Sequence, residues 1–193
     1  MKNVHFQRGD ITKFKGDAVV NAANVVCLGG GGVDGAIQRA AGPELKEWIK
    51  DNVPADKHGT RCHTGDAIIT AGFGLRAKWI IHTVGPMFHD SPTVRNVAYA
   101  GEIAEKALFA DVEPRVLLAK AIRSSLELAE AKGIKTLAFP AISCGVFGCL
   151  VSVFAKVLHE VMSEKEWPLQ VWVVLYEEWD FAEFKQTWGF LAE

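Results

Sequence analysis

The chain has 193 residues, 49% of them hydrophobic and 23% charged, which is typical of one globular domain and argues against a disordered, collagen-like or disulfide-stabilised chain. The 21 lysines and arginines and the 23 aspartates and glutamates give a net charge of −2, so nucleic acid is not expected as a partner. Backbone amides could still bind a small anion. No apolar run approaches the roughly 18 residues that span a bilayer, and the first residues lack the apolar core of a signal peptide, so we expect no membrane association and a cytoplasmic protein, or a nuclear one in a eukaryote.

Strands and helices are predicted to alternate along the chain, from short apolar runs and from apolar residues at helical spacing. In chain order they are the strands Val4–Gln7 and Ala18–Asn21, the helices Val33–Ala41 and Pro43–Lys50, the strands Asp66–Thr70 and Trp79–Thr83, the helix Pro114–Lys132, the strand Thr136–Pro140, the helix Val151–Met162, the strand Val171–Leu175 and the helix Asp180–Trp188. This alternation predicts the α/β class, as a three-layer α/β/α sandwich.

Three details of these elements can be checked against a structure. Val33, Ala36, Ile37 and Ala40 are expected to form the buried face of their helix. Asp180 is expected to be the N-cap of the last helix. The connection 87–113 is longer than usual, and it predicts a surface insertion, with a helix over 96–109, in a single domain that covers residues 1–193.

The most informative segment joins the strand at Ala18 to the helix at Val33 and contains two asparagines, Asn21 and Asn24, and four glycines, 29–32. Consecutive glycines are conformationally costly and make sense where backbone N–H groups must lie close to a ligand. The helix N-terminus behind them adds its own free N–H groups and partial positive charge, which favours a phosphate. A flexible surface turn is the alternative interpretation.

Two better-known phosphate motifs do not explain this segment. Gly30, Gly32 and Gly35 satisfy G-x-G-x-x-G, but they do not directly follow the strand, and Asp51 does not end a second strand as the Rossmann fingerprint requires. The Gly-Lys-Ser/Thr of a P-loop is absent.

A second glycine-containing loop, Phe139-Pro-Ala-Ile-Ser-Cys-Gly-Val-Phe-Gly148, again lies between a strand and a helix. Open α/β sheets bind ligands at the carboxyl ends of their strands, so two such loops predict a pyrophosphate held from both sides. Phe147 offers an aromatic face in this loop, or is a core residue. Asp10, after the first strand, could accept a hydrogen bond from the adenine amine or could form a local Asx-type turn.

The chain resembles the macrodomain family of ADP-ribose-binding proteins, and most of all its MacroD-type hydrolases. The motifs that carry the resemblance follow the family's order over nearly the whole chain: Gly9-Asp-Ile-Thr12, Val20-Asn-Ala-Ala-Asn24, Gly29–Gly42, Cys62-x-Thr-Gly65, Ile80-Ile-His-Thr-Val-Gly-Pro86 and Ala138-Phe-Pro-Ala-Ile-Ser143. The resemblance implies a three-layer fold around a mixed central sheet.

The resemblance also implies a role for each site residue. Adenine would contact Asp10, Ile11 and Tyr176, with Trp179 and Phe181 as competing candidates for the aromatic role. The diphosphate would contact Gly29, Gly30, Gly31, Gly32 and Val33 together with Ser143, Cys144, Gly145, Val146 and Phe147. Asn24 would bind and orient the distal ribose, and Asp34 would position or activate a water there, so these two are the expected catalytic residues.

The expected activity is hydrolysis of ester-linked ADP-ribose, with O-acetyl-ADP-ribose and proteins mono-ADP-ribosylated on Asp or Glu as substrates. We expect a monomer that needs no cofactor and no metal. The chain departs from the family pattern at Gln38, where histidine is usual, at Cys144 and Phe147, where threonine and tyrosine are usual, and at Leu150, where bacterial hydrolases commonly have proline. We expect binding to survive these departures, because its main contacts are made by the backbone.

Three alternatives remain open at this point. The protein could be a non-catalytic reader of ADP-ribose. Asp34 could be only the N-cap of its helix. Cys144 could be a nucleophile activated by a base such as His82, although the four cysteines (Cys27, Cys62, Cys144 and Cys149) lack zinc-ribbon or C-x-x-C spacing and are more simply interpreted as buried thiols.

Overall fold

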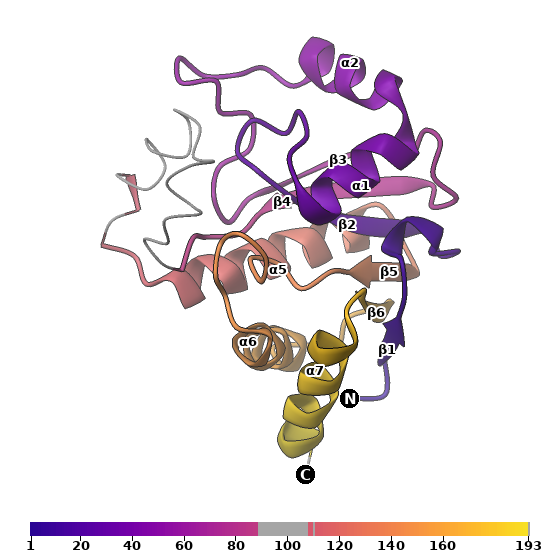
Figure 1. The fold of residues 1–193 in the computed structure, drawn as a ribbon, viewed down its shortest axis with the longest axis vertical. Helices are drawn as coiled ribbons and strands as arrows, with labels where there is room; N and C mark the ends of the chain where they lie inside the picture. The colour runs from indigo at the N-terminus through magenta and orange to yellow at the C-terminus, as the bar shows by residue number, and fades with distance from the viewer. Residues whose placement is uncertain (89–107, 110, 193) are drawn as a thin grey trace.

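A six-stranded sheet lies at the centre of the computed structural model, which describes residues 1–88, 108–109 and 111–192 (Figure 1). Its strands are β1 (Val4–Arg8), β2 (Ala18–Ala23), β3 (Ala67–Ala71), β4 (Trp79–Val84), β5 (Thr136–Phe139) and β6 (Gln170–Leu175). The helices are α1 (Gly32–Ala41), α2 (Pro43–Asn52), α5 (Pro114–Ala131), α6 (Val151–Ser163) and α7 (Glu178–Ala192), with the short 3₁₀ helix η1 (Ile11–Lys13) after β1.

The strand order along the sheet is β1-β6-β5-β2-β4-β3. All neighbouring strands run parallel except β3, which is antiparallel to β4. The mixed sheet is therefore confirmed. Because the five parallel strands point the same way, the loops that follow them all emerge at one edge of the sheet, which we call the carboxyl edge.

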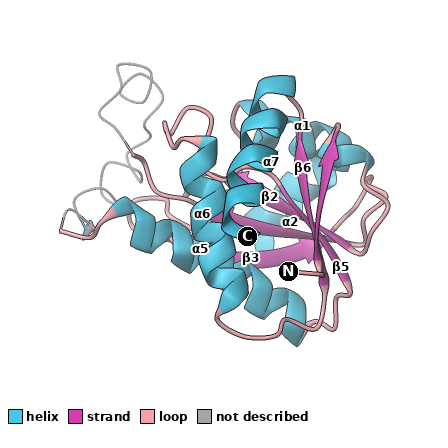
Figure 2. Cartoon of the chain, turned by 90° about the horizontal axis from the view of Figure 1, so that it is seen from below, coloured by secondary structure: helices cyan, strands magenta, loops and turns pink. Residues whose placement is uncertain are grey.

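Helices cover both faces of the sheet, which confirms the three-layer sandwich. Figure 1 shows α1 and α2 on one side of the strands and α6 and α7 on the other, and Figure 2 shows α5 and α6 next to one another. Side chains alternate along each strand, so Val20 packs in the core with α5, α6 and α7, while its neighbour Val19 packs in the core with α1 and α2. Phe154 and Ile37 are fully buried in these two cores, and each such side chain contributes about 1.5–3 kcal/mol to folding.

The predicted strands and helices within the described residues are present, with ends that differ by a few residues, but two details were wrong. Helix α1 buries Asp34, Gly35, Ile37 and Ala41 rather than Val33, Ala36 and Ala40, because a buried polar contact of Asp34 sets the rotation of the helix. Helix α7 begins at Glu178, whose carboxylate forms an ion pair with Arg8. Asp180 therefore lies in the first turn of α7 and is not its N-cap. Most of the insertion 87–113, with the helix expected at 96–109, lies outside the described residues.

Candidate functional site

The two glycine-containing loops emerge side by side at the carboxyl edge. The first, residues 24–31, follows β2, and the second, residues 140–150, follows β5. These strands are neighbours, with Ala18 and Val19 of β2 in register with Leu137 and Ala138 of β5. Figure 1 shows each loop leading into a helix, α1 or α6. The structure therefore brings the two predicted phosphate-binding segments together.

Asn24 shapes the first loop. Its side-chain oxygen accepts hydrogen bonds from the amides of Val26 (3.2 Å) and Cys27 (3.0 Å), and its amide nitrogen donates to the carbonyl of Gly29 (3.1 Å). Cys27 adopts a left-handed conformation, with φ of 57°, inside the turn that these bonds close. Asn24 thus fixes the shape of the loop in addition to any role toward a ligand.

The glycines of the first loop have two distinct surroundings. A Cβ on Gly30 would lie 3.0 Å from Oδ2 of Asp34 and 3.1 Å from Nδ2 of Asn24, and a Cβ on Gly35 would lie 2.6 Å from the carbonyl oxygen of Gly30. A Cβ on Gly31 or Gly32 would meet no atom within 4 Å. The loop is therefore packed closely on one side and open on the side of Gly31 and Gly32.

Backbone donors at the start of α1 remain available to an anion. Gly31 is the N-cap residue and supplies no side-chain capping bond. The amides at an α-helix N-terminus have no intrahelical acceptor, and within the described residues none of the amides of 29–33 donates to another backbone group. This agrees with the predicted phosphate role, which remains a prediction.

Asp34 is almost fully buried under this loop, with 4% of its surface exposed. Its Oδ1 accepts a hydrogen bond from Nδ2 of Asn21 (2.7 Å), while Oδ2 has no hydrogen-bond partner within the described residues. Burial raises the pKa of the Asp34 carboxyl, and the bond from Asn21 partly offsets this effect. The Gln38 amide, one turn further along α1, approaches the carboxyl and also lowers its pKa without reaching hydrogen-bond geometry. Because Gly31 is the N-cap, the interpretation of Asp34 as the helix cap is wrong.

A buried polar chain continues from Asp34 across three strands, β2, β4 and β3, and sequence reasoning did not find it. Nδ2 of Asn21 also lies 3.1 Å from Nδ1 of His82, and Nε2 of His82 lies 3.0 Å from the hydroxyl of Thr70. Since Nδ2 can only donate, Nδ1 accepts and His82 carries its proton on Nε2, which donates to Thr70. Complete burial lowers the pKa of His82 to about 3, so the ring is neutral.

The second loop is held in an uncommon conformation. Ser143 has a φ of 64°, is buried, and its Oγ has no hydrogen-bond partner within the described residues. A Cβ on Gly85 would come within 2.2 Å of that Oγ, so glycine after β4 is what lets the loop pack here. A left-handed non-glycine residue with an unsatisfied buried hydroxyl is a form of strain that clusters at functional sites.

Part of the second loop also presents free backbone donors. The amides of Cys144, Gly148 and Cys149 donate to carbonyls of the same segment. Within the described residues, the amides of 145–147 donate to no backbone carbonyl, whereas the carbonyl of Phe147 accepts from the amide of Phe88 (2.8 Å). The best-placed hydrogen-bond donors to an anion in this loop are therefore the amides of Gly145, Val146 and Phe147. Cys144 contributes through the shape of the turn.

The predicted adenine residues lie at the far end of the same edge. The amide of Gly9 donates to the carbonyl of Leu175, which places Asp10 beside Tyr176. Oδ1 of Asp10 accepts from the amide and the hydroxyl of Thr12, so the Asx-type turn is present, and Oδ2 makes no hydrogen bond within the described residues. Tyr176 and Trp179 are exposed (73% and 68%), whereas Phe181 packs partly against the core and is the weakest of the three aromatic candidates.

The Cys-His nucleophile is not supported by this geometry. Both ring nitrogens of His82 are occupied by Asn21 and Thr70. Hydrogen bonding to Cys149 and burial raise the pKa of the Cys144 thiol. A reactive thiol needs the opposite shift in pKa.

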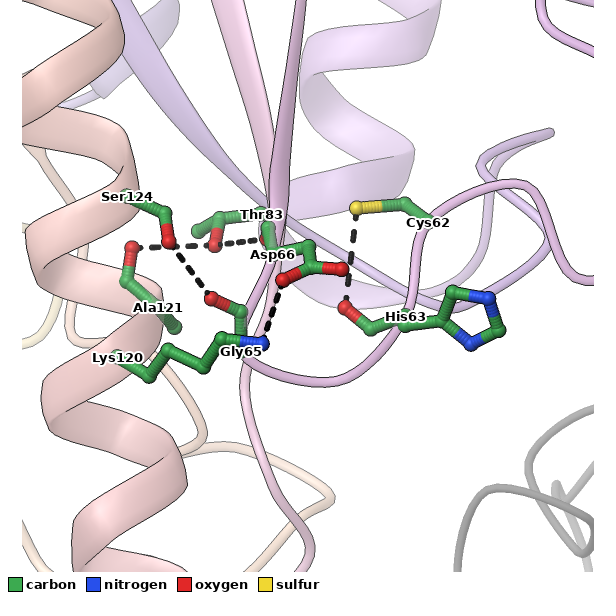
Figure 3. Close-up of polar contacts among 8 residues, drawn as sticks. All are labelled: Cys62, His63, Gly65, Asp66, Thr83, Lys120, Ala121 and Ser124. Atoms are coloured by element: carbon green, nitrogen blue, oxygen red, sulfur yellow. Dashed lines mark hydrogen bonds and ion pairs between the residues drawn. The ribbon is translucent and has the colours of Figure 1, made fainter. Parts of the chain in front are cut away.

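Figure 3 shows the segment Cys62–Asp66 beside the part of α5 that carries Lys120 and Ser124. The amides of Arg61 and Cys62 donate to the carbonyl of Val25, and Ser124 of α5 donates to the carbonyl of Gly65 (2.9 Å). Figure 3 also shows the ion pair between Lys120 and Asp66. A hollow of about 500 Å³ beside this segment is lined by none of the predicted site residues, all of which lie in the described part of the chain.

The described residues contain no cluster of three or more His, Cys, Asp or Glu that could hold a metal ion. In the same part of the chain, no helix combines the length and the apolar character needed to cross a membrane.

The described residues form an α/β protein in which two adjacent glycine-containing loops follow neighbouring parallel strands, and such an edge is where open α/β sheets commonly bind ligands. The family model of the Macro domain matches residues 20–158, and the chain belongs to this family. An O-acetyl-ADP-ribose deacetylase of Cronobacter turicensis is 40% identical over 96% of this chain and 96% of its own length.

Two solved structures are similar over most of the chain. The Oceanobacillus iheyensis macrodomain with ADP has a TM-score of 0.77 and 36% identity, covering 95% of this chain and 88% of that one. The Trypanosoma brucei macrodomain in complex with ADP-ribose has a TM-score of 0.73 and 29% identity, covering 95% and 68% respectively.

Proposed function

We propose that the chain binds ADP-ribose along the carboxyl edge and hydrolyses an ester bond at the distal ribose. The observation that carries this proposal is the order of the site residues along the sheet. Asp10 and Tyr176 follow β1 and β6, the second loop follows β5 and the first loop follows β2, which are consecutive strands. At about 4.8 Å per strand, these residues form a row that suits adenine, diphosphate and distal ribose in turn. The names of the relatives support the same ligand and reaction.

Each part of the ligand would meet a group suited to it. Oδ2 of Asp10 would accept from the adenine amine, close to the backbone of Ile11, and Tyr176 would stack on the ring. The diphosphate would receive hydrogen bonds from the amides of 29–33 and 145–147 and from the Ser143 hydroxyl. Backbone donors and the N-terminus of α1 together stabilise such an anion without any net positive charge.

The proposed chemistry is attack of water on the carbonyl carbon of the ester. Asn24 would orient the ribose hydroxyls, and Oδ2 of Asp34 would accept a proton from the attacking water. The tetrahedral intermediate would then collapse with breakage of the C–O bond to the ribose, and the ribose oxygen would take up the proton held by Asp34. Free ADP-ribose leaves as the alcohol, and the acyl group leaves as a carboxylic acid. A pKa raised by burial brings the Asp34 carboxyl closer to neutral pH, as a general base requires. General-base help of this kind typically contributes 10²–10⁴-fold.

One observation favours a second candidate, a non-catalytic ADP-ribose reader. Oδ2 of Asp34 is buried next to Gly30, so this carboxylate oxygen does not reach solvent. In that case Asp34 would act only through Asn21, by holding the first loop in its binding shape.

The test is to incubate the full chain separately with O-acetyl-ADP-ribose and with a protein mono-ADP-ribosylated on glutamate, and to follow free ADP-ribose by chromatography. Release from both substrates supports the proposal. Release from the small ester alone removes modified proteins as a substrate class. Tight binding of ADP-ribose without release from either substrate would establish the reader.

A further inference from the structure

The buried polar chain behind Asp34 has a fixed hydrogen-bond direction from end to end. At its far end the Thr70 hydroxyl donates its single hydrogen to the carbonyl of Ala71 (3.1 Å), so toward His82 the Thr70 oxygen can only accept. At its near end the Asn21 amide nitrogen can only donate, and it lies 3.1 Å from Nδ1 of His82. Both ends therefore require the same tautomer of His82, with the proton on Nε2 and a lone pair on Nδ1.

The tautomer in turn determines which way the Asn21 amide faces. The amide nitrogen carries two hydrogens, and it donates one to Nδ1 of His82 and the other to Oδ1 of Asp34 (2.7 Å). With the amide turned over, the Asn21 oxygen would face two acceptors, the Nδ1 lone pair and the carboxylate. All three side chains are buried, where an unsatisfied polar contact is costly. His82 therefore selects the one amide orientation that supports Asp34.

The chain holds Asp34 from one side only. Oδ1 accepts the bond from Asn21, whereas Oδ2 has no hydrogen-bond partner within the described residues. Oδ2 lies toward the first loop, where a Cβ on Gly30 would come within 3.0 Å of it. Asp34 belongs to helix α1, but the side chains that support it come from the strands β2, β4 and β3. Support from rigid elements and from further hydrogen bonds keeps a reacting group in a precise place.

We propose that Thr70, His82 and Asn21 are positioning residues for the proposed hydrolysis, on which this inference rests. They hold Oδ1 of Asp34 from the side of the sheet and leave Oδ2 as the oxygen that accepts the proton of the attacking water. Thr70 is three hydrogen bonds away from Asp34, so it acts only through the residues between them. No proton moves along the chain, because His82 keeps its proton on Nε2 throughout.

A positioning role and a merely structural role predict different losses. If the chain only stabilised the core, breaking it would lower the melting temperature and leave the turnover of the folded protein unchanged. If it positions Asp34, breaking it lowers kcat for O-acetyl-ADP-ribose while the affinity for ADP-ribose stays the same. The loss of one hydrogen bond to a charged group corresponds to a rate about tenfold to a hundredfold lower.

The experiment measures kcat at saturating O-acetyl-ADP-ribose and the calorimetric affinity for ADP-ribose, using the full chain and its variants. Asn21→Leu keeps the approximate shape and removes both donors, so kcat should fall about tenfold to a hundredfold. Thr70→Val removes only the hydroxyl at the far end of the chain, which makes it the variant more certain to fold, and kcat should fall about tenfold. Thr70→Ser restores the hydroxyl and should restore the rate. None of these variants should change the affinity.

Thr83→Val is the matched control. Thr83 follows His82 on β4, so its side chain lies on the opposite face of the sheet. Its hydroxyl is also buried, and it lies 2.8 Å from the carbonyl oxygen of Asp66 and 3.2 Å from that of Ala121 (Figure 3). Thr83→Val therefore removes a buried hydroxyl outside the chain. It should lower the melting temperature and leave both kcat and the affinity unchanged.

Two further measurements test whether the effect passes through His82 and Asp34. In ¹⁵N NMR spectra of the histidine rings, His82 should carry its proton on Nε2 in the unaltered chain, and the form protonated on Nδ1 should appear in Thr70→Val. The His82 signal is the one that His82→Gln lacks. In a double-mutant cycle, Thr70→Val should lower the rate no further once Asp34→Asn is present.

Different results would overturn different parts of the inference. A proton on Nδ1 in the unaltered chain would contradict the direction of the chain and with it the proposal. Unchanged kcat in folded Thr70→Val, or an equal loss in Thr83→Val, would leave only a structural role. A loss of affinity in Thr70→Val would favour the reader, in which Asp34 only shapes the first loop. No ester hydrolysis by the unaltered chain would refute the proposed function and the positioning role together, while the NMR spectra would still decide on the direction of the chain.

Discussion

His82 gives a quantitative prediction for how stability depends on pH. The ring is fully buried between Asn21 and Thr70, and burial lowers its pKa from 6.5 to about 3. In the unfolded chain the ring is exposed and binds a proton below about pH 6.5. The folded state does not bind that proton until about pH 3. The stability due to the neutral ring is therefore complete above pH 6.5 and is lost as the pH falls toward 3.

The size of the effect follows from linkage. Each pH unit between the two pKa values costs about 1.36 kcal/mol of unfolding free energy. At about pH 5, one and a half units below the unfolded pKa, this gives a loss of about 2 kcal/mol, and the full loss below pH 3 is about 5 kcal/mol. A loss of 2 kcal/mol is a large part of the 5–15 kcal/mol by which a domain is usually stable.

The assay is urea unfolding of the unaltered chain and of His82→Gln at pH 7 and at pH 5. His82→Gln lowers stability at pH 7, because it disturbs the bonds to Asn21 and Thr70, but its stability should fall by about 2 kcal/mol less between the two pH values. The other titrating groups are present in both proteins, so their contribution cancels in this comparison. Equal losses in the two proteins would mean that His82 is protonated in the folded state, and the polar chain as described would be wrong.

Three further predictions concern the ligand. Asp10→Ala should weaken ADP-ribose binding by roughly 1.5–3 kcal/mol, the contribution of a hydrogen bond to a charged group, and should abolish discrimination against the hypoxanthine analogue; retained discrimination would remove Asp10 from the adenine site. Gly31→Val and Gly32→Val should both abolish binding, because their side chains enter the open side of the first loop. Only Gly32→Val should also lower the melting temperature, since Gly32 has a φ of +53° whereas Gly31 has a φ of −92°. A variant that keeps its affinity would show that the loop does not touch the ligand. AMP should bind more weakly than ADP-ribose in calorimetric titrations, and equal affinity would leave no case for a clamp on the diphosphate.

The sequence was most informative where local pattern determines structure. Apolar periodicity located the strands and helices, and the glycine runs located both loops, because these signals depend on residues that are near one another in the chain. The α/β/α layers then followed from the alternation of the elements.

Features that depend on tertiary contacts were missed. Asn21 and His82 each lie in an apolar strand, and only the register of β2 with β4, which pairs these two residues, shows that they hydrogen-bond to one another. The rotation of α1 could not be inferred from its apolar residues because the bond from Asn21 to Asp34 draws a polar side chain inward. One polar residue in each of two predicted apolar strands was the one signal that could have pointed to the buried chain.

The most direct test of the account compares Asp34→Asn with the unaltered chain in two measurements, the rate of O-acetyl-ADP-ribose hydrolysis at saturating substrate and the affinity for ADP-ribose. The substitution keeps the shape of the side chain, and its Oδ1 can still accept the hydrogen bond from Asn21. It removes only the charge that would take a proton from water. The account predicts a rate lower by about two or more powers of ten, with an affinity that changes far less. Hydrolysis at the unaltered rate would contradict it, because Asp34 would then have no part in the chemistry.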